Sequence, residues 1–380
     1  MDFKAIVDNR HEYAKSWKAK TGGKVLGWYE PYFPEEVAYA AGVLPVRIMA
    51  KPYPDDVSDK WIYASCYPVR NMVNQFLKRH YEYIDGLVNV EGCQWMYNAW
   101  EVAVNNNPEL WNHYLFFPDY TDAPTSKSVL RSELDLFKGL MEKWTGKSIT
   151  NEDLDRAIEV YNENRLLMKQ ICQMRRMDRP VINGAEMMNI VLASQVMDKA
   201  EINELLRSFI QELETREPGQ DRIRLMLIGS ETWDTALEEM VESMGGDIVI
   251  DELDNGTGYY WNNIIPNRDR LMSIGLKYLD RPKNPIKDNN WRRRPQHIFE
   301  LAEDYNIDGA LVVKQIYCHL HGTDNYAVSK ILRERYIPYH FFERDTTLPI
   351  EETRLRLESF MNMLKPGMTH LAGWHKAYGE

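Results

Sequence analysis

The stretch GALVVKQIYCHLHGTDN, residues 309–325, places four chemically capable side chains directly after an apolar run. They are Cys318, His319, His321 and Asp324. Thiols, imidazoles and carboxylates are the groups that bind metal ions, move protons and attack carbonyl carbons. A cysteine in such a place is a nucleophile, a metal ligand or a small buried side chain. The positions of the other cysteines bear on that choice.

Two of the three other cysteines occupy comparable places. Cys93 follows the apolar run GLVNV, and Cys66 precedes a helical pattern that leads into that run. Cys172 differs, because it lies inside a long helical pattern with Met168 on the same face, as expected of core packing. Functional groups in open α/β sheets gather at the carboxyl ends of strands. Cys66, Cys93 and Cys318 are therefore the candidates for a shared site.

Spacing alone leaves several interpretations of these thiols open. The chain has no CxxC pair, which argues against an ordinary zinc knuckle or a ferredoxin-type run. The three cysteines form one metal site, or they are three unrelated buried thiols. A third interpretation is a catalytic dyad of Cys318 with His319, which requires a further group to orient the base. Residues adjacent in sequence rarely point at each other, which weighs against the dyad.

The elements that must position these residues follow an α/β pattern. Short apolar runs alternate with longer amphipathic stretches, which is typical of parallel sheets covered by helices. Strands are predicted at residues 24–29, 43–49, 83–90, 113–118, 222–230, 247–252, 308–313 and 337–342. We expect two Rossmann-like or flavodoxin-like α/β domains with mainly parallel sheets, residues 1–127 and 218–380. A helical segment, residues 128–217, joins them.

Composition and charge argue against several classes of protein. The chain has 380 residues and a formal net charge of −11, whereas a nucleic-acid-binding protein usually presents a basic face. No uncharged apolar run reaches the roughly 18 residues of a membrane span. The first residues also lack the apolar core of a signal peptide. We expect a cytoplasmic protein with reduced cysteines and neither a nucleic-acid nor a membrane partner.

Five segments together resemble the benzoyl-CoA reductase and 2-hydroxyacyl-CoA dehydratase family. They are GWYEPYFPEEVAYAAGVLPVRIM, SCYPVRN, VEGCQW, VYNENR and VKQIYCHLHGTD, which lie in the expected order within residues 27–366. The resemblance implies that Cys66, Cys93 and Cys318 hold an iron–sulfur cluster, usually [4Fe–4S]. Cys172 matches nothing in the family pattern.

The resemblance also implies partners and a substrate. A second cluster belongs to a homologous sister subunit, and a separate ATP-hydrolysing iron–sulfur protein, with ferredoxin upstream, supplies low-potential electrons. ATP is then used only by that partner. The substrate is an acyl-CoA thioester, whose carbonyl delocalises an added electron. Because three cysteines bind only three of four irons, one iron is open to water, hydroxide, a side-chain oxygen or the substrate.

Proton donors are needed beside such a cluster. His319 and His321 are the nearest candidates in sequence, and Glu30 follows the first predicted strand. The simpler roles are a histidine that hydrogen-bonds the backbone or a cluster sulfide, and a carboxylate that caps a turn.

Substrate contacts are predicted at three further residues. Trp233 and Tyr259 lie near predicted strand ends, where their rings would line a pocket for a planar acyl group. Arg292, in the basic run WRRRP, is expected to bind phosphate, because guanidinium groups match phosphate oxygens. The simpler roles are aromatic core packing for the two rings and the solvated start of a helix for the arginine.

These features together predict a catalytic-core subunit of an ATP-dependent benzoyl-CoA reductase. That enzyme is an oxidoreductase that converts an aromatic acyl-CoA thioester to a cyclohexadiene carbonyl-CoA. The alternative within the family is a subunit of a 2-hydroxyacyl-CoA dehydratase, a lyase that acts through a ketyl radical. A further alternative is a partner subunit that relays electrons and binds no substrate.

Overall fold

The computed structural model describes residues 1–51, 57–282, 284–287, 294–345 and 350–365. Within these residues lie two four-stranded sheets, and all their strands are parallel. The first contains β1 (Val25–Trp28), β2 (Leu44–Arg47), β3 (Gly86–Val90) and β4 (Trp111–Leu115). The second contains β5 (Ile223–Gly229), β6 (Gly246–Glu252), β7 (Gly309–Gln315) and β8 (Tyr339–Arg344). The predicted α/β class with parallel sheets is confirmed, and every predicted strand is present.

The two sheets share one strand order. The first runs β2-β1-β3-β4 and the second β6-β5-β7-β8, so the order in which strands are added reverses between β1 and β3 and again between β5 and β7. The central strands are almost continuously apolar and buried, because helices cover both faces of a parallel sheet. Ligands of doubly wound folds bind at such reversal points, beyond the carboxyl ends of the strands.

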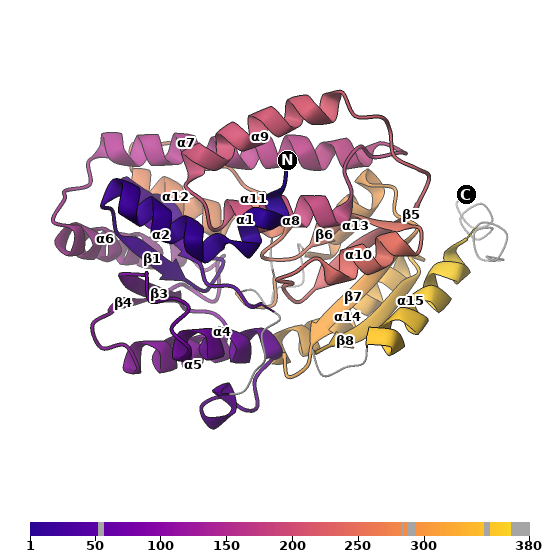
Figure 1. Cartoon of the computed structure of the whole chain (residues 1–380), viewed down its shortest axis with the longest axis horizontal. Helices are drawn as coiled ribbons and strands as arrows, with labels where there is room; N and C mark the ends of the chain where they lie inside the picture. The colour runs from indigo at the N-terminus through magenta and orange to yellow at the C-terminus, as the bar shows by residue number, and fades with distance from the viewer. Residues whose placement is uncertain (52–56, 283, 288–293, 346–349, 366–380) are drawn as a thin grey trace.

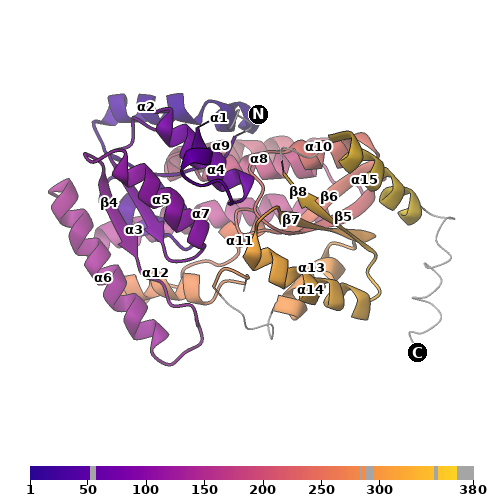
Figure 2. The ribbon, with the colours of Figure 1, turned by 90° about the horizontal axis from the view of Figure 1, so that it is seen from below.

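Helices surround both sheets. Those associated with the first half are α1 (Phe3–Asp8), α2 (Arg10–Thr21), α3 (Glu35–Ala40), α4 (Tyr67–Leu77) and α5 (Gln94–Asn105). Those associated with the second half are α10 (Ala236–Ser243), α11 (Thr257–Tyr260), α12 (Arg270–Leu279), α13 (Arg294–Asp304), α14 (His319–Glu334) and α15 (Ile350–Leu364). Figure 2 shows the second sheet between α10 and α15 on one side and α13 and α14 on the other.

The stretch between the sheets is helical, as expected. It comprises α6 (Ser126–Thr145), α7 (Asn151–Gln173), α8 (Gly184–Ser194) and α9 (Lys199–Glu214), and a short 3₁₀ turn at Met174–Arg176 follows α7. A second 3₁₀ turn, Ser58–Lys60, lies in the first half of the chain. Helix α7 begins with a capping box in which Thr150 and Asp153 satisfy each other's backbone amides. Helices α7 and α9 run along one side of the molecule, beside both sheets (Figure 1).

The two halves are held together by shared packing. Helix α12 follows the second sheet's β6 in sequence but packs against α6 and α7. The buried apolar residues form one cluster that includes both sheets. Cys172 belongs to this core, with its Sγ 3.1 Å from the Tyr305 hydroxyl. Among the described residues, no helix combines the length and apolar character needed to cross a bilayer.

Candidate functional site

The loops that follow β1, β3, β5 and β7 converge on one pocket between the two sheets. It holds about 490 Å³ of empty space, counting the part open to solvent. Its chemically capable lining residues are Cys66, Cys93, Cys318, Glu30, Glu231 and His321. The pocket therefore lies at the carboxyl ends of the central strands, where the strand order of each sheet reverses.

Each of the three cysteines in the pocket is the residue immediately before a helix. Cys66 precedes α4, Cys93 precedes α5 and Cys318 precedes α14, all with extended backbone angles. The positive ends of three helices thus face one pocket, an arrangement that favours anionic groups there.

The thiols themselves are held in a low-polarity environment. Burial raises the pKa of Cys66 to about 12, and it raises those of Cys93 and Cys318 as well. The amide N–H groups three residues further along each helix oppose this rise. Burial contributes most to the raised pKa of Cys93, and the charge of Glu30 comes next. The charges of Cys66 and Cys318 raise this pKa further, because negative charges on neighbouring groups repel. The three sulfurs are therefore electrostatically coupled, and a bound cation would favour their thiolate forms.

Two carboxyl groups stand beside the thiols. Glu30 Oε1 accepts a hydrogen bond from the backbone N–H of Cys93 at 2.9 Å. Glu231 Oε1 accepts one from Nη2 of Arg47 at 2.6 Å. Burial, and then the charge of Glu231, raises the pKa of Glu30 to about 8. Burial also raises the pKa of Glu231, although the positive charge of the nearby Arg47 lowers it in part.

His321 also reaches the pocket, from the first turn of α14. Its side chain is buried and its Nδ1 lies 3.9 Å from Oδ2 of Asp324, without a hydrogen-bond partner among the described residues. Burial, and then the positive charge of Arg294, lowers the pKa of His321 to about 3. The imidazole is therefore neutral at physiological pH, with one nitrogen that donates and one that accepts.

The other predicted site residues are distributed differently. Trp233 lines the pocket and is buried. His319 is exposed at the start of α14 and does not line the pocket. Tyr259 lies in α11, which packs against α7, with its ring 5.3 Å from Nζ of the buried Lys199. Arg292 lies outside the described residues.

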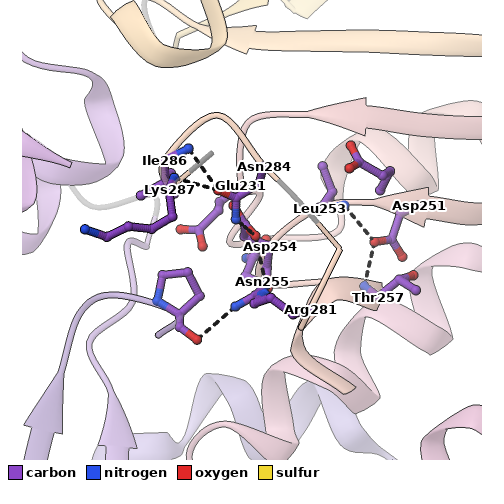
Figure 3. Close-up of polar contacts among 12 residues, drawn as sticks. Glu231, Asp251, Leu253, Asp254, Asn255, Thr257, Arg281, Asn284, Ile286 and Lys287 are labelled. Atoms are coloured by element: carbon purple, nitrogen blue, oxygen red, sulfur yellow. Dashed lines mark hydrogen bonds and ion pairs between the residues drawn. The ribbon is translucent and has the colours of Figure 1, made fainter. Parts of the chain in front are cut away.

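A set of polar contacts joins the loops next to the pocket (Figure 3). Asp254, just after β6, accepts hydrogen bonds from Nη2 of Arg281 at 2.8 Å and from the side-chain amide of Asn284. Arg281 Nη1 also donates to the Pro31 carbonyl at 2.9 Å, so it joins the loop after β1 to the loop after β6. Asn284 Oδ1 accepts from the backbone N–H of Ile286, a pocket residue, at 2.8 Å.

Two groups in this region were missed from the sequence. Glu231 follows β5 in the run IGSE, and its position after a strong strand pattern was the available signal. Arg47 closes β2 and contacts Glu231 across 184 residues of sequence, a pairing that no local pattern reveals. No group of three or more His, Cys, Asp or Glu side chains in the described ranges converges closely enough to bind a single metal ion.

The sequence is similar to known proteins along most of its length. Residues 31–364 match the family model described as 2-hydroxyglutaryl-CoA dehydratase, D-component. The chain is 24% identical to the (R)-phenyllactyl-CoA dehydratase beta subunit of Clostridium sporogenes, over 96% of this chain and 98% of that protein. It is 22% identical to a benzoyl-CoA reductase subunit of Thauera aromatica, over 87% and 88%.

A third relative is also named as a dehydratase subunit. The chain is 21% identical to the (R)-2-hydroxyglutaryl-CoA dehydratase beta subunit of Acidaminococcus fermentans, over 96% of this chain and 98% of that one. The relatives are enzyme subunits named for reactions on acyl-CoA thioesters. Since the family model covers most of the sequence, the chain belongs to the family of 2-hydroxyacyl-CoA dehydratase and benzoyl-CoA reductase subunits.

Proposed function

We propose that this chain is the cluster-bearing subunit of an enzyme complex that acts on acyl-CoA thioesters. Cys66, Cys93 and Cys318 are the proposed ligands of a [4Fe–4S] cluster. The observation that carries the proposal is the convergence of these three thiols, each just before a helix, on one pocket between the two sheets.

The donor set fits such a cluster. Three thiols are the ligand type that iron–sulfur clusters take from proteins. Each thiolate of a cubane binds a different iron, so the sulfurs need not converge as tightly as the ligands of one ion. Three helix N-termini compensate the negative charge of a thiolate-bound cluster. The carboxyl groups of Glu30 and Glu231 lie at the same pocket and offer oxygen atoms beside the sulfurs.

The residues around the thiols have distinct tasks under this proposal. When bound, the cluster supplies low-potential electrons and one iron open to an oxygen ligand. The neutral His321 imidazole and the Glu30 carboxyl are the pocket groups that hold or pass a proton. Glu30 is oriented by the Cys93 amide. The apolar side chains in the wall, which include Val69, Met96 and Ile286, reduce the contact of the site with water.

An adjoining pocket provides room for a substrate. It holds about 1090 Å³ of empty space, counting the part open to solvent, and shares Pro68, Trp233 and Gln315 with the three-cysteine pocket. Trp233 stands at the junction, and its buried Nε1 has no hydrogen-bond partner among the described residues. We propose that Trp233 contacts the acyl thioester, as its position at a strand end predicts.

Two reactions are candidates for the complex. Reduction of benzoyl-CoA is supported by the similarity to the benzoyl-CoA reductase subunit of Thauera aromatica. Dehydration of a 2-hydroxyacyl-CoA is favoured by the similarity to the phenyllactyl-CoA and 2-hydroxyglutaryl-CoA dehydratase beta subunits. Both reactions begin with electron transfer to a thioester, so the same pocket chemistry serves either. The relatives are named as subunits, which supports a multi-subunit complex. Within it, a sister subunit and an ATP-hydrolysing, ferredoxin-fed electron donor are the partners that we propose.

The assay that separates these reactions uses the anaerobically purified complex, expressed with its neighbouring gene products. It is incubated with reductant, ATP and either benzoyl-CoA or (R)-phenyllactyl-CoA. Formation of a cyclohexadiene carbonyl-CoA establishes the reductase, and formation of the unsaturated acyl-CoA from phenyllactyl-CoA establishes the dehydratase. A cluster-loaded complex that consumes neither thioester would contradict both assignments of substrate.

A further inference from the structure

Arg47 lies directly behind the wall of the three-cysteine pocket. It is the last residue of β2 and its side chain is fully buried. The guanidinium carbon lies 4.9 Å from the centre of the Trp28 ring and 4.7 Å from that of Trp233. Trp28 ends β1 of the first sheet, and Trp233 follows β5 of the second. A cation is thus held between aromatic rings from the two halves of the molecule.

Hydrogen bonds fix the position of this guanidinium group. Nη1 donates to Oε1 of Gln195 at 2.8 Å, and Nη2 donates to Oε1 of Glu231 at 2.6 Å. Gln195 in turn donates to the Asn255 carbonyl at 3.0 Å. The Glu231 side chain is 13% exposed, and Glu231 and Trp233 both line the pocket. Arg47 therefore determines where the Glu231 carboxyl stands beside the thiols.

Stability alone does not account for this buried pair. Taking two charges out of water costs several kcal/mol per ion, so buried ion pairs often contribute little net stability compared with apolar packing. The same low polarity strengthens the action of each charge on a neighbouring group. Charged groups held at fixed positions beside a redox centre alter the free energy of adding an electron to that centre.

We propose that Arg47 and Glu231 together set the reduction potential of the cluster held by the three cysteines, with Arg47 as the positioning residue for the Glu231 carboxylate. This inference rests on the proposed function. The positive charge of Arg47 favours the added electron and raises the potential, and the Glu231 carboxylate opposes the electron and lowers it. Arg47 also acts electrostatically on Glu30, which lines the same pocket.

The test is an EPR-monitored redox titration of the full-length, anaerobically purified chain, with iron per chain measured on each sample. Arg47→Gln is expected to shift the midpoint potential to a more negative value. Glu231→Gln is expected to shift it to a more positive value, and the double variant to lie between the two. Arg47→Lys keeps the charge and is expected to stay near the native potential.

The matched control removes an equal charge away from the pocket. Asp155 pairs with Arg270, 2.9 Å apart, in a surface ion pair, so Asp155→Asn is expected to leave the potential unchanged. If Glu231→Gln retains its iron and its midpoint potential equals that of the native chain, the inference is overturned while the cluster proposal stays intact. Absence of iron from the native chain would instead defeat the proposed function. If Arg47→Gln does not fold, the midpoint potentials of Glu231→Gln and Arg47→Lys test the inference.

Discussion

Glu238, in α10, is a buried carboxyl group whose two oxygens have no hydrogen-bond partner among the described residues. Burial raises its pKa from 4.5 to about 8. The folded state therefore binds more protons than the unfolded state between these values. The stability contributed by the neutral carboxyl is complete below pH 4.5 and is lost as the pH rises through 8.

We expect Glu238→Gln to remove this loss. At pH 8 the variant should be more stable than the native chain by on the order of 2–4 kcal/mol, because an amide cannot ionise. Urea unfolding between pH 5 and pH 9 measures the difference. Glu239→Gln alters an exposed neighbour and should keep the native pH dependence. Parallel pH profiles for native and Glu238→Gln chains would contradict the assignment.

Single residues were predictable where their role depends on a strand end. The pocket positions of Cys93 and Cys318 followed from the apolar runs before them, that of Cys66 from the helical pattern after it, and that of Glu30 from the end of the first strand. Only the position where α14 begins distinguishes His319 from His321, because residues two apart in a helix point in different directions. Tyr259 was expected in the pocket, but α11 packs it toward α7 instead. Its predicted substrate contact has no support from its position.

At the scale of elements, the end of β5 depends on a glycine. Gly229 has φ +129°, and a Cβ there would stand 2.0 Å from the Val313 carbonyl oxygen on β7. Gly229→Ala therefore forces β5 and β7 apart just before Ser230 and Glu231. We expect a loss of about 2–4 kcal/mol of unfolding free energy, measured by urea denaturation.

Gly139 provides the matched control for this substitution. It lies in α6, and a Cβ there meets no atom within 4 Å. Because alanine is the better helix former, Gly139→Ala is expected to gain up to about 1 kcal/mol. Equal effects of the two substitutions would contradict the close approach of β5 and β7.

The strands were predictable because their apolar runs are continuous, as burial on both faces of a parallel sheet requires. The pattern does not fix the exact bounds of a strand: β4 was expected at residues 113–118 and occupies Trp111–Leu115. Helix α12 was not predicted. It contains Gly275 in its interior, which weakens the local helical signal. In the fold, a Cβ at Gly275 would lie 3.1 Å from Leu134 of α6, so tertiary packing explains the glycine.

At the scale of the whole molecule, one pocket is shared by the two sheets. It lies at the point in each sheet where the strand order reverses. Cys66 and Cys93 come from the first half and Cys318 from the second. The sequence predicted two α/β units but not their relative orientation. That orientation depends on long-range contacts, such as the Arg281 bridge to Pro31 and the packing of α12 on α6. The predicted domain boundaries remain a prediction.

The central claim is that three of the four cysteines hold one iron–sulfur cluster. Iron per chain, measured after anaerobic purification of the native protein and four Cys→Ser variants, tests it most directly. The native chain should contain about four irons. Cys66→Ser, Cys93→Ser and Cys318→Ser should each lose iron, whereas Cys172→Ser should retain it, because Cys172 lies in the core beside Tyr305. An iron-free native chain, or equal iron loss in Cys172→Ser, would contradict the account.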